Sequence, residues 1–238
     1  MNTQSQHTAV WKDVFRTRLM TARPMLLFTA VYLTVFFLIE RWNRLHFTVI
    51  HMAADDVIPF CEIFILPYLA WFFYVALYTV YLLIADEENY HKTATYLAVG
   101  MGAFLFISIV FPNIHFLRPE VMPRQNVFTD LVQMIYSSDT PTNLTPSIHV
   151  YNSIAIMIAV VHTNTEFMKR SRIVKGLLLL QGVLIILSTM FIKQHSVSDV
   201  LVAFALSAMI YVLVYRLDFV YSPVRSSGKV RRRAVGRV

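Results

Sequence analysis

The sequence predicts an all-α, polytopic membrane protein with six transmembrane helices. Of its 238 residues, 57% are apolar and only 15% are charged, and the mean hydropathy is +0.56. Soluble domains average about 45–50% apolar and about 25% charged residues, so an ordinary soluble enzyme and a disordered chain are both poor fits. The single cysteine, Cys61, excludes a disulfide scaffold and a cysteine-ligated zinc site.

Six apolar stretches account for this fold class. A helix that crosses a bilayer needs about 20 predominantly apolar residues. The chain contains no internal repeat and no low-complexity segment, so residues 1–238 are expected to form one domain. The fourth and fifth stretches are the most polar. The predicted spans are residues 24–41, 60–84, 94–112, 146–163, 173–192 and 197–215.

The distribution of basic residues predicts the orientation of these spans. Five of the 21 Lys and Arg residues fall on one side, and the other sixteen fall on the side that carries both termini. Cytoplasmic loops carry an excess of Lys and Arg, so both termini are expected to be cytoplasmic. The basic tails 1–23 and 217–238 suit anionic lipid headgroups, and no nucleic-acid partner is expected. The five basic residues on the opposite side are Arg41, Arg44, Arg118, Arg124 and Lys193.

Polar residues gather at the extracytoplasmic ends of the predicted spans. The longest connection, residues 113–145, contains apolar residues at helical spacing over 127–136, which predicts a short helix on the membrane surface. Ionisable residues held inside a membrane bundle are costly and usually functional. Three groups lie at about one membrane depth: Arg118-Pro119, then Pro146-Ser147-Ile148-His149, then His195 with Asp199.

His195 and Asp199 are four residues apart and therefore share one face of a helix. A carboxylate in that position can accept the proton of one ring nitrogen and leave the other nitrogen free as a base or a nucleophile. An interfacial pair that only caps the helix is the alternative.

The start of the fourth span has features of an anion site. Pro146 suits the first position of a helix, with Thr145 as its N-cap. The backbone amides of Ser147 and Ile148 would then lie at a helix N-terminus, which attracts phosphate. His149, one turn further, could donate a proton to a leaving oxygen. The alternative is a proline-initiated helix with an interfacial histidine.

Together these groups favour phosphoryl transfer through a phosphohistidine. Arg118 can bind phosphate oxygens through two parallel hydrogen bonds, although by itself it fits a contact with lipid headgroups better. The two histidines, the carboxylate, the arginine and the helix N-terminus form the pattern. A serine nucleophile is disfavoured because the chain lacks a Gly-x-Ser-x-Gly motif.

Over about residues 93–215, the pattern resembles the type 2 phosphatidic acid phosphatases, or lipid phosphate phosphatases. The motifs of that family are Lys-x6-Arg-Pro, Pro-Ser-Gly-His and Ser-Arg-x5-His-x3-Asp. Arg118-Pro119 matches the end of the first motif, and residues 146–149 match the second with Ile148 in place of glycine. Ser188, His195 and Asp199 match the third motif at the family's spacing.

The resemblance implies a role for each matching residue. His195 would attack phosphorus, Asp199 would orient it, and His149 would protonate the leaving oxygen. Arg118 and the amides near Ser147 would bind the phosphate oxygens. The resemblance also implies a six-span enzyme that needs no metal or other cofactor and takes a lipid phosphate from the bilayer. Phosphatidic acid, phosphatidylglycerol phosphate and polyprenyl pyrophosphate all fit, and no oligomeric state is predicted.

The chain departs from the family pattern at two phosphate-binding cations. Phe111 stands at the position of the first-motif lysine, and Thr189 stands at the position of the third-motif arginine. Lys193 is the favoured substitute, because it lies two residues before His195 on the same short loop. Arg124 is the second candidate and His115 a third option. The residues expected to bind substrate are Arg118, Ser147, Lys193 and Arg124.

The missing cations leave two alternatives open. A phosphodiester carries one negative charge and needs fewer cations than a phosphomonoester. Sphingomyelin and inositol phosphorylceramide synthases are similar in keeping a His/His/Asp triad, so a headgroup transferase is one alternative. A non-catalytic phospholipid-binding or transport protein is the other. A transporter should show matched helix breaks or mid-membrane polar residues, whereas Pro67 and Gln181 have no counterpart in the other half.

Overall fold

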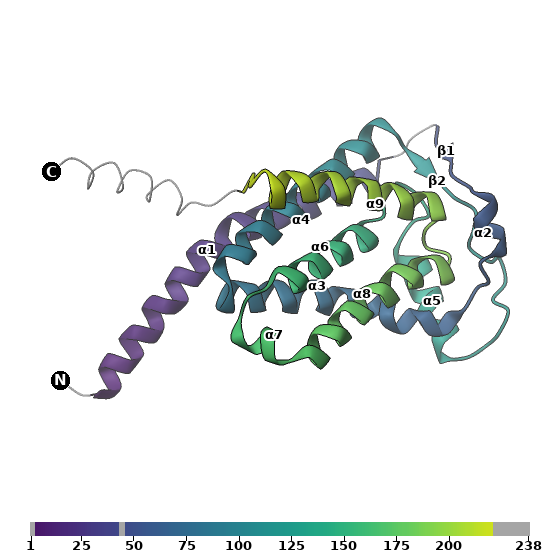
Figure 1. The fold of residues 1–238 in the computed structure, drawn as a ribbon. Coiled ribbons are helices and arrows are strands. Elements are labelled where there is room, and N and C mark those ends of the chain that lie inside the picture. The colour runs from purple at the N-terminus through teal and green to yellow at the C-terminus, as the bar shows by residue number, and fades with distance from the viewer. Residues whose placement is uncertain (1–2, 43–45, 221–238) are drawn as a thin grey trace.

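The computed structural model of the chain describes residues 3–42 and 46–220, and these form a bundle of helices (Figure 1). Two strands of two residues each, β1 and β2, pair in parallel and are a minor addition to the predicted all-α fold. The elements in chain order are α1 (Thr3–Glu40), β1 (Thr48–Val49), α2 (Ala53–Val57), η1 (Glu62–Phe64), α3 (Ile65–Ala85), α4 (Glu87–Val110), β2 (Asn113–Ile114), α5 (Val127–Ser138), α6 (Ile148–His162), α7 (Glu166–Arg170), α8 (Arg172–Phe191), α9 (Val197–Tyr211) and η2 (Val212–Arg216).

All six predicted spans are helical, but they differ in length. The predicted fourth span corresponds to α6, which is apolar but has only 15 residues, fewer than the roughly 20 that a crossing helix needs. The lengths therefore confirm an all-α membrane protein and leave the count of six as a prediction. Within the described residues, five segments are long and apolar enough to cross a membrane: Phe15–Glu40, Glu62–Ala85, Glu87–Val110, Arg172–Phe191 and Val197–Arg216.

Two helices begin earlier than the hydropathy predicts. α1 starts at Thr3, so most of the predicted polar tail, 1–23, is helical. α4 starts at Glu87, seven residues before the predicted span, because Asp86 caps it: the Asp86 side chain accepts a hydrogen bond from the Asn89 amide at 3.2 Å. Caps and hydropathy are separate signals, and the cap sets this boundary.

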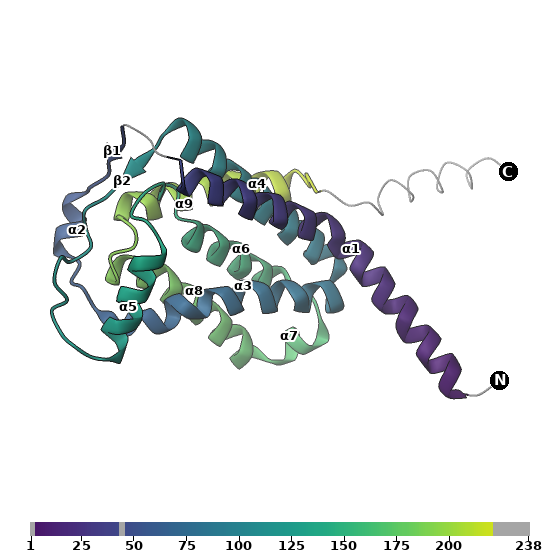
Figure 2. The same cartoon turned by 180° about the vertical axis from the view of Figure 1, so that it is seen from behind.

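Helix α6 lies in the middle of the bundle, where α3, α4, α8 and α9 pack around it (Figures 1 and 2). More than half of its residues are buried, and Val150, Tyr151 and Ile156 are fully enclosed. A helix that is surrounded by other helices contacts protein instead of lipid. Its short length is therefore compatible with a place inside a membrane bundle.

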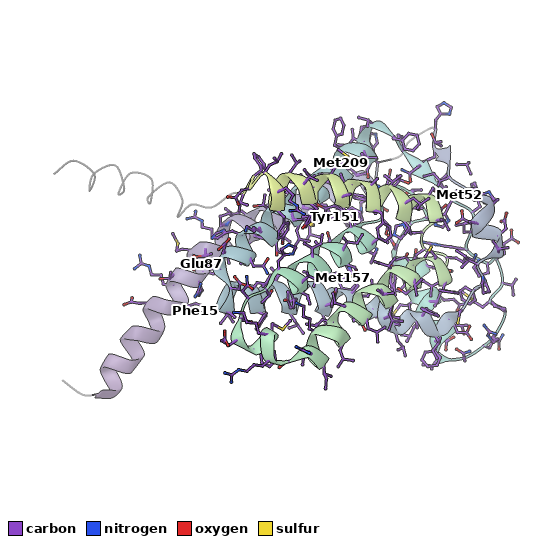
Figure 3. All side chains as sticks on the ribbon, viewed as in Figure 1. Phe15, Met52, Glu87, Tyr151, Met157 and Met209 are labelled. Atoms are coloured by element: carbon purple, nitrogen blue, oxygen red, sulfur yellow. The ribbon has the colours of Figure 1, made fainter. Side chains whose placement is uncertain are left out.

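The outer faces of the surrounding helices are apolar. Large side chains such as Leu27 on α1, Phe73 on α3, Leu180 on α8 and Met209 on α9 are more than half exposed. Figure 3 shows side chains projecting from the bundle in this way, with Met209 labelled on α9 and Tyr151 in the interior. Contiguous apolar faces of this extent mark contact with lipid or a partner, and here they cover the helices long enough to span a membrane.

The two ends of the bundle differ (Figures 1 and 2). At one end, which we call the loop end, lie α2, α5, β1 and β2, the starts of α6 and α9, and the ends of α4 and α8. The predicted helix at 127–136 is present there as α5. The start of α1, α7 and η2 lie at the opposite end. The predicted orientation also depends on Arg44 and on the basic residues of 221–238, which lie outside the described residues.

A close approach between α4 and α6 at Gly100 yields a stability prediction. A Cβ atom there would overlap the ring of Tyr151. That ring is held in place, because it stacks on Tyr96 with centroids 5.1 Å apart and its hydroxyl donates to the Tyr96 carbonyl at 2.7 Å. Gly100→Ala is therefore expected to lower the free energy of unfolding by about 1–3 kcal/mol, the usual cost of overpacking.

Thermal unfolding in detergent measures this effect, with Gly102→Ala as the matched control. Gly102 lies in the same helix, and a Cβ there would have no neighbouring atom within 4 Å. The control should unfold at or above the temperature of the native chain, since alanine favours helix more than glycine does. Equal losses in both variants would show that packing against Tyr151 is not the cause.

Candidate active site

The structure brings His149, His195 and Asp199 together at the loop end of the bundle. His149 lies in the first turn of α6, and His195 lies in the turn between α8 and α9. The centroids of the two imidazole rings are 5.7 Å apart. Asp199, in the first turn of α9, is fully buried, and its Oδ2 lies 3.4 Å from Nδ1 of His195. The predicted pairing of the two histidines and the carboxylate is therefore present.

Several donors hold the Asp199 carboxylate in place. Its Oδ2 accepts the Ser196 amide at 3.0 Å, and its Oδ1 accepts the hydroxyl of Thr145. The 3.4 Å separation from His195 is long for a hydrogen bond. Because a carboxylate can only accept, the Nδ1 atom that faces it carries the ring proton. Nε2 of His195 is then the unprotonated nitrogen.

The turn that carries His195 follows from local sequence. The Thr189 carbonyl accepts two amides, those of Gln194 at 2.9 Å and His195 at 3.0 Å, which ends α8 in a tight turn. Ser196 then caps α9, while Asp199 accepts the Ser196 amide in return. This reciprocal arrangement is a capping box. The Asp199 carboxylate therefore both stabilises the start of α9 and orients the His195 ring.

His149 is enclosed by aromatic side chains of α3 that the sequence did not single out. Its ring stacks on Tyr68, with centroids 4.6 Å apart, and lies 4.4 Å from the ring of Trp71. The two aromatic residues are three positions apart on one helix face. Aromatic residues are frequent in membrane spans, so that spacing alone could not identify them as neighbours of His149.

The predicted start of the fourth span is wrong by two residues. Ser147, not Thr145, is the N-cap of α6, and its hydroxyl accepts the Val150 amide at 3.4 Å. Asp199 is the reason, because its carboxylate takes the Thr145 hydroxyl and its carbonyl accepts the Ser147 amide at 3.3 Å. The Ser147 amide, expected to face phosphate, thus has a partner within the chain. The Thr145–Pro146 peptide bond is cis.

Arg118 lies beside the turn that carries His195. Its Nη1 donates to the carbonyls of Tyr136 at 3.2 Å and Asp139 at 2.8 Å, and its Nη2 donates to Oε1 of Gln194 at 2.7 Å. The guanidinium also lies 4.5 Å from the centre of the Tyr136 ring. Burial raises the pKa of Asp139, while the nearby charge of Arg118 opposes that rise. Of the predicted substrate-binding cations, Arg118 is the one whose side chain is hydrogen-bonded to Gln194, the residue before His195.

The side chains of Lys193 and Arg124 bind groups away from the histidine pair. The Lys193 ammonium donates to the carbonyls of Asp55 at 2.7 Å and Ile58 at 2.5 Å. Burial lowers its pKa, although the charge of Asp55 opposes that effect. Arg124 forms two parallel hydrogen bonds with Glu62, at 2.7 and 2.6 Å. Both cations therefore stabilise the segment before α3, and neither is brought to the histidine pair.

Neither family cation position is filled by a charged group. Phe111 follows the last turn of α4 and is 42% exposed, while the buried Thr189 donates its hydroxyl to the Ile186 carbonyl at 2.8 Å. His115 has two partners: its Nε2 lies 3.0 Å from the Gln194 carbonyl, and its Nδ1 accepts the Leu117 amide at 3.2 Å. Burial lowers the pKa of His115, which favours this neutral form with the proton on Nε2.

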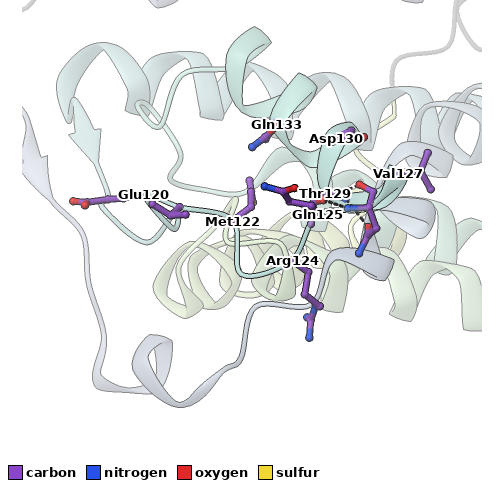
Figure 4. Close-up of a pocket in the computed structure, with 10 residues that line it drawn as sticks. Glu120, Met122, Arg124, Gln125, Val127, Thr129, Asp130 and Gln133 are labelled. Atoms are coloured by element: carbon purple, nitrogen blue, oxygen red, sulfur yellow. Dashed lines mark hydrogen bonds between the residues drawn. The ribbon is translucent and has the colours of Figure 1, made fainter.

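A pocket of about 570 Å³ lies at the loop end but apart from the histidines (Figure 4). Of the residues expected to bind substrate, its lining includes Arg124, whose guanidinium is bound to Glu62. All of its lining residues come from 120–133, the segment that leads into α5 and its first turns. The pocket is therefore a feature of the long connection and not of the histidine site.

Asp55, from α2, supports the turn that carries His195. Its Oδ2 accepts the Ser196 hydroxyl at 2.6 Å, and its Oδ1 accepts the Val197 amide at 2.7 Å. Burial alone would raise the pKa of Asp55, but hydrogen bonds from Ser196, Val197 and Met52 outweigh burial, and the pKa lies below its ordinary value. The carboxylate is therefore charged at neutral pH and anchors the start of α9.

Asp55→Asn is expected to lower the free energy of unfolding by about 1–3 kcal/mol. The NH₂ group of asparagine is a donor, so it cannot accept the hydrogen bonds that a carboxylate oxygen accepts at that position. The turn that holds His195 loses its anchor in this variant. Thermal unfolding in detergent measures the effect. Asp56→Asn is the control, because the Asp56 side chain is 66% exposed and pairs with His51. An unchanged Asp55→Asn variant would reject the anchoring role.

A model of the PAP2 superfamily matches residues 93–221, which is more than half of the chain. The matched segment contains Arg118, His149, His195 and Asp199, so the residues that the structure gathers at the loop end are within it. No curated protein and no solved structure was found to match the chain. The extent of the family match, together with the motif residues assembled at one end of a membrane bundle, shows that the chain belongs to the PAP2 superfamily, the type 2 phosphatidic acid phosphatases and their relatives.

Proposed function

We propose that the chain hydrolyses a lipid phosphate or lipid pyrophosphate through a phosphohistidine on His195, without a metal ion. Membership of the PAP2 superfamily supports phosphatase or related phosphotransferase activity. The observation that carries the finer proposal is the pairing of His149 with His195, with ring centroids 5.7 Å apart and Asp199 facing Nδ1 of His195. Such a pair can supply a nucleophile and a proton donor to one phosphoryl group.

In the first step, Nε2 of His195 forms a bond to phosphorus while the bond from phosphorus to the lipid oxygen breaks. His149 gives a proton to that oxygen, so the lipid leaves as an alcohol, or as a monophosphate when the substrate is a pyrophosphate. Asp199 keeps the Nδ1 proton in place and balances the positive charge that develops on the His195 ring.

In the second step, His149 takes a proton from water, and the hydroxide oxygen bonds to phosphorus as the phosphorus–nitrogen bond breaks. Orthophosphate leaves, and both histidines return to their starting states. Arg118 is proposed to bind phosphate oxygens in both steps, because its position beside the His195 turn is fixed by three hydrogen bonds.

The proposed site faces the extracytoplasmic side of the cell membrane. In this arrangement α6 is the fourth of six spans, both termini are cytoplasmic, and the loop end faces outward. The amphipathic α5 lies on the membrane surface, and the substrate headgroup lies beneath the 113–145 connection. Support comes from the distribution of basic residues in the sequence and from the exposed apolar faces of the surrounding helices, along which a lipid tail could enter.

The test uses purified protein in detergent with EDTA and a panel of lipid phosphates and lipid pyrophosphates. Release of orthophosphate from at least one lipid is expected, and the pattern across the panel identifies the substrate class. A folded native chain that releases no orthophosphate from any lipid, with or without added divalent cations, would overturn the hydrolase proposal. Release that needs the added cations would overturn its metal-independent mechanism.

A headgroup transferase is a second candidate, favoured by the partners of two cations. Lys193 and Arg124 are engaged with the segment before α3, which leaves Arg118 to bind phosphate. A phosphodiester has one negative charge and suits such a site better than a phosphomonoester dianion. The chemistry would be the same, with a lipid hydroxyl in place of water in the second step. Labelled headgroup transfer from a phosphodiester lipid to a lipid alcohol would support this candidate over hydrolysis.

A further inference from the structure

We infer that Gln194 binds the substrate phosphate, and that its side-chain amide and the Arg118 guanidinium form one hydrogen-bonding site for phosphate oxygens. The inference rests on the proposed phosphoryl-transfer function. It assigns a role to a position that the family motif leaves open to any residue. Three features of the structure support it: the contacts that hold the amide, the amide atom that is unpaired, and the partners of the other candidate cations.

Three hydrogen bonds hold Gln194 in place, and the residue is only 1% exposed. Its backbone amide donates to the Thr189 carbonyl at 2.9 Å, and its own carbonyl lies 3.0 Å from Nε2 of His115. Its side-chain Oε1 accepts Nη2 of Arg118 at 2.7 Å. A side chain fixed at both backbone and tip is preorganised and loses little conformational entropy on binding a ligand.

Arg118 determines which way the Gln194 amide faces. A guanidinium has only donors, so the amide oxygen must face it, and the amide nitrogen must lie on the other side. That nitrogen, Nε2 of Gln194, is buried and has no hydrogen-bond partner among the described residues. A buried donor without a partner is unfavourable unless a ligand or a water molecule supplies an acceptor.

Arg118 has an unpaired donor of its own. Its Nη1 and Nη2 are paired within the chain, whereas Nε is buried and has no partner in the part of the chain that the structure describes. The two unpaired N–H groups belong to side chains joined by one hydrogen bond, and Gln194 immediately precedes His195. Two neighbouring donors next to the proposed nucleophile suit the oxygens of the phosphoryl group that it attacks.

The other candidates for this role are occupied. Lys193 and Arg124 bind the segment before α3, and His115 donates its Nε2 proton to the Gln194 backbone. The phenyl ring of Phe111 and the Thr189 hydroxyl, at the two family cation positions, supply no positive charge. Gln194 therefore replaces a charged ligand by a neutral donor, and His115 positions Gln194 instead of binding phosphate itself.

The experiment measures binding of inorganic orthophosphate to the purified full chain in detergent, by isothermal titration calorimetry. Gln194→Met removes the donor and is expected to weaken binding about 10- to 100-fold, the effect of losing a hydrogen bond to a charged group. Gln194→Glu keeps an acceptor for Arg118 and replaces the free N–H by a carboxylate oxygen. It is expected to abolish measurable binding through repulsion.

Gln181→Met is the matched control. Gln181 also has a buried side-chain nitrogen without a partner among the described residues, but it lies in α8 ten residues before that helix ends. At 1.5 Å per residue, this places it about 15 Å along the helix from the His195 turn. The control is expected to bind orthophosphate as the native chain does. Thermal unfolding of all three variants separates loss of binding from loss of fold.

Phosphate binding by Gln194→Glu equal to that of the native chain would overturn the inference, because Gln194 would then only hold Arg118. Absence of binding to the native chain would overturn it too. The proposed function is tested separately by turnover. Binding that depends on Gln194 without hydrolysis or transfer of any lipid phosphate supports this inference and counts against the proposed function. Turnover of a lipid phosphate together with orthophosphate binding that does not depend on Gln194 supports the proposed function and counts against this inference.

Discussion

Replacing His195 with alanine is expected to abolish phosphate release, with a loss of roughly 10³-fold or more, because the variant lacks the nucleophile of the covalent route. The His195 ring is almost fully buried beside Asp199, and its Nε2 is the nitrogen free to attack phosphorus. A substrate labelled with ³²P allows direct measurement of the intermediate. The native chain, denatured during turnover, should retain label on a histidine, which survives base and is released by acid.

His51→Ala is the control for this experiment. His51 is also at the loop end, but its side chain is 47% exposed and pairs with Asp56. The control should retain both labelling and turnover. If His195→Ala folds normally and still forms a labelled phosphohistidine at the native rate, the nucleophile is another residue and the proposed mechanism is wrong.

Replacing His149 with phenylalanine is expected to slow release from a lipid phosphate by about 10²- to 10⁴-fold, the usual contribution of a general acid. Phenylalanine preserves an aromatic ring against Tyr68 and Trp71, so the stacking that encloses His149 is retained. What the variant loses is the proton for the leaving oxygen. An alkoxide is a poor leaving group without that proton, whereas a nitrophenolate leaves readily without it.

This difference separates the two histidines. p-Nitrophenyl phosphate should be cleaved by His149→Phe with a much smaller loss than a lipid phosphate, whereas His195→Ala should lose both activities. Because His149 also takes the proton from water in the second step, the comparison uses the first step alone, measured in a single turnover as release of nitrophenolate or of the lipid alcohol. An equal loss in that step on both substrates for His149→Phe would show that His149 does not protonate the leaving group.

The helices were largely predictable because membrane spans depend on one strong signal, the length of an apolar run. Every predicted span is helical, and α5 was visible from its apolar spacing. The starts of α1 and α4 were missed because the residues there are polar. The cap at Asp86 extends α4 beyond the apolar run, and hydropathy does not register such a cap.

The histidine site was predictable in part. His195 and Asp199 are four residues apart, so their spacing is enough to place them together, although His195 lies in the turn before α9 and not on a shared helix face as expected. The side chains of Lys193 and Arg124 were expected near phosphate from their positions in the chain, but a long flexible cation binds wherever acceptors are available. The carbonyls that bind Lys193 lie some 135 residues earlier in the chain, a contact that no local pattern encodes. Gln194 carries no charge and stands at a position that the family motif leaves open, so the role inferred for it depends on the contacts that hold its side chain and on its unpaired nitrogen.

The contacts of α2, η1 and α3 show that the side chains supporting the candidate site and the loop end are not confined to the family-matched segment. Asp55 anchors the start of α9, Glu62 binds Arg124, and Tyr68 and Trp71 enclose His149, yet all four precede residue 93, where the match begins. The first third of the chain thus supports the His149 ring and the turn that carries His195. A chimera that joins the matched segment to the N-terminal helices of another protein would contain the motif residues but not the side chains that position them.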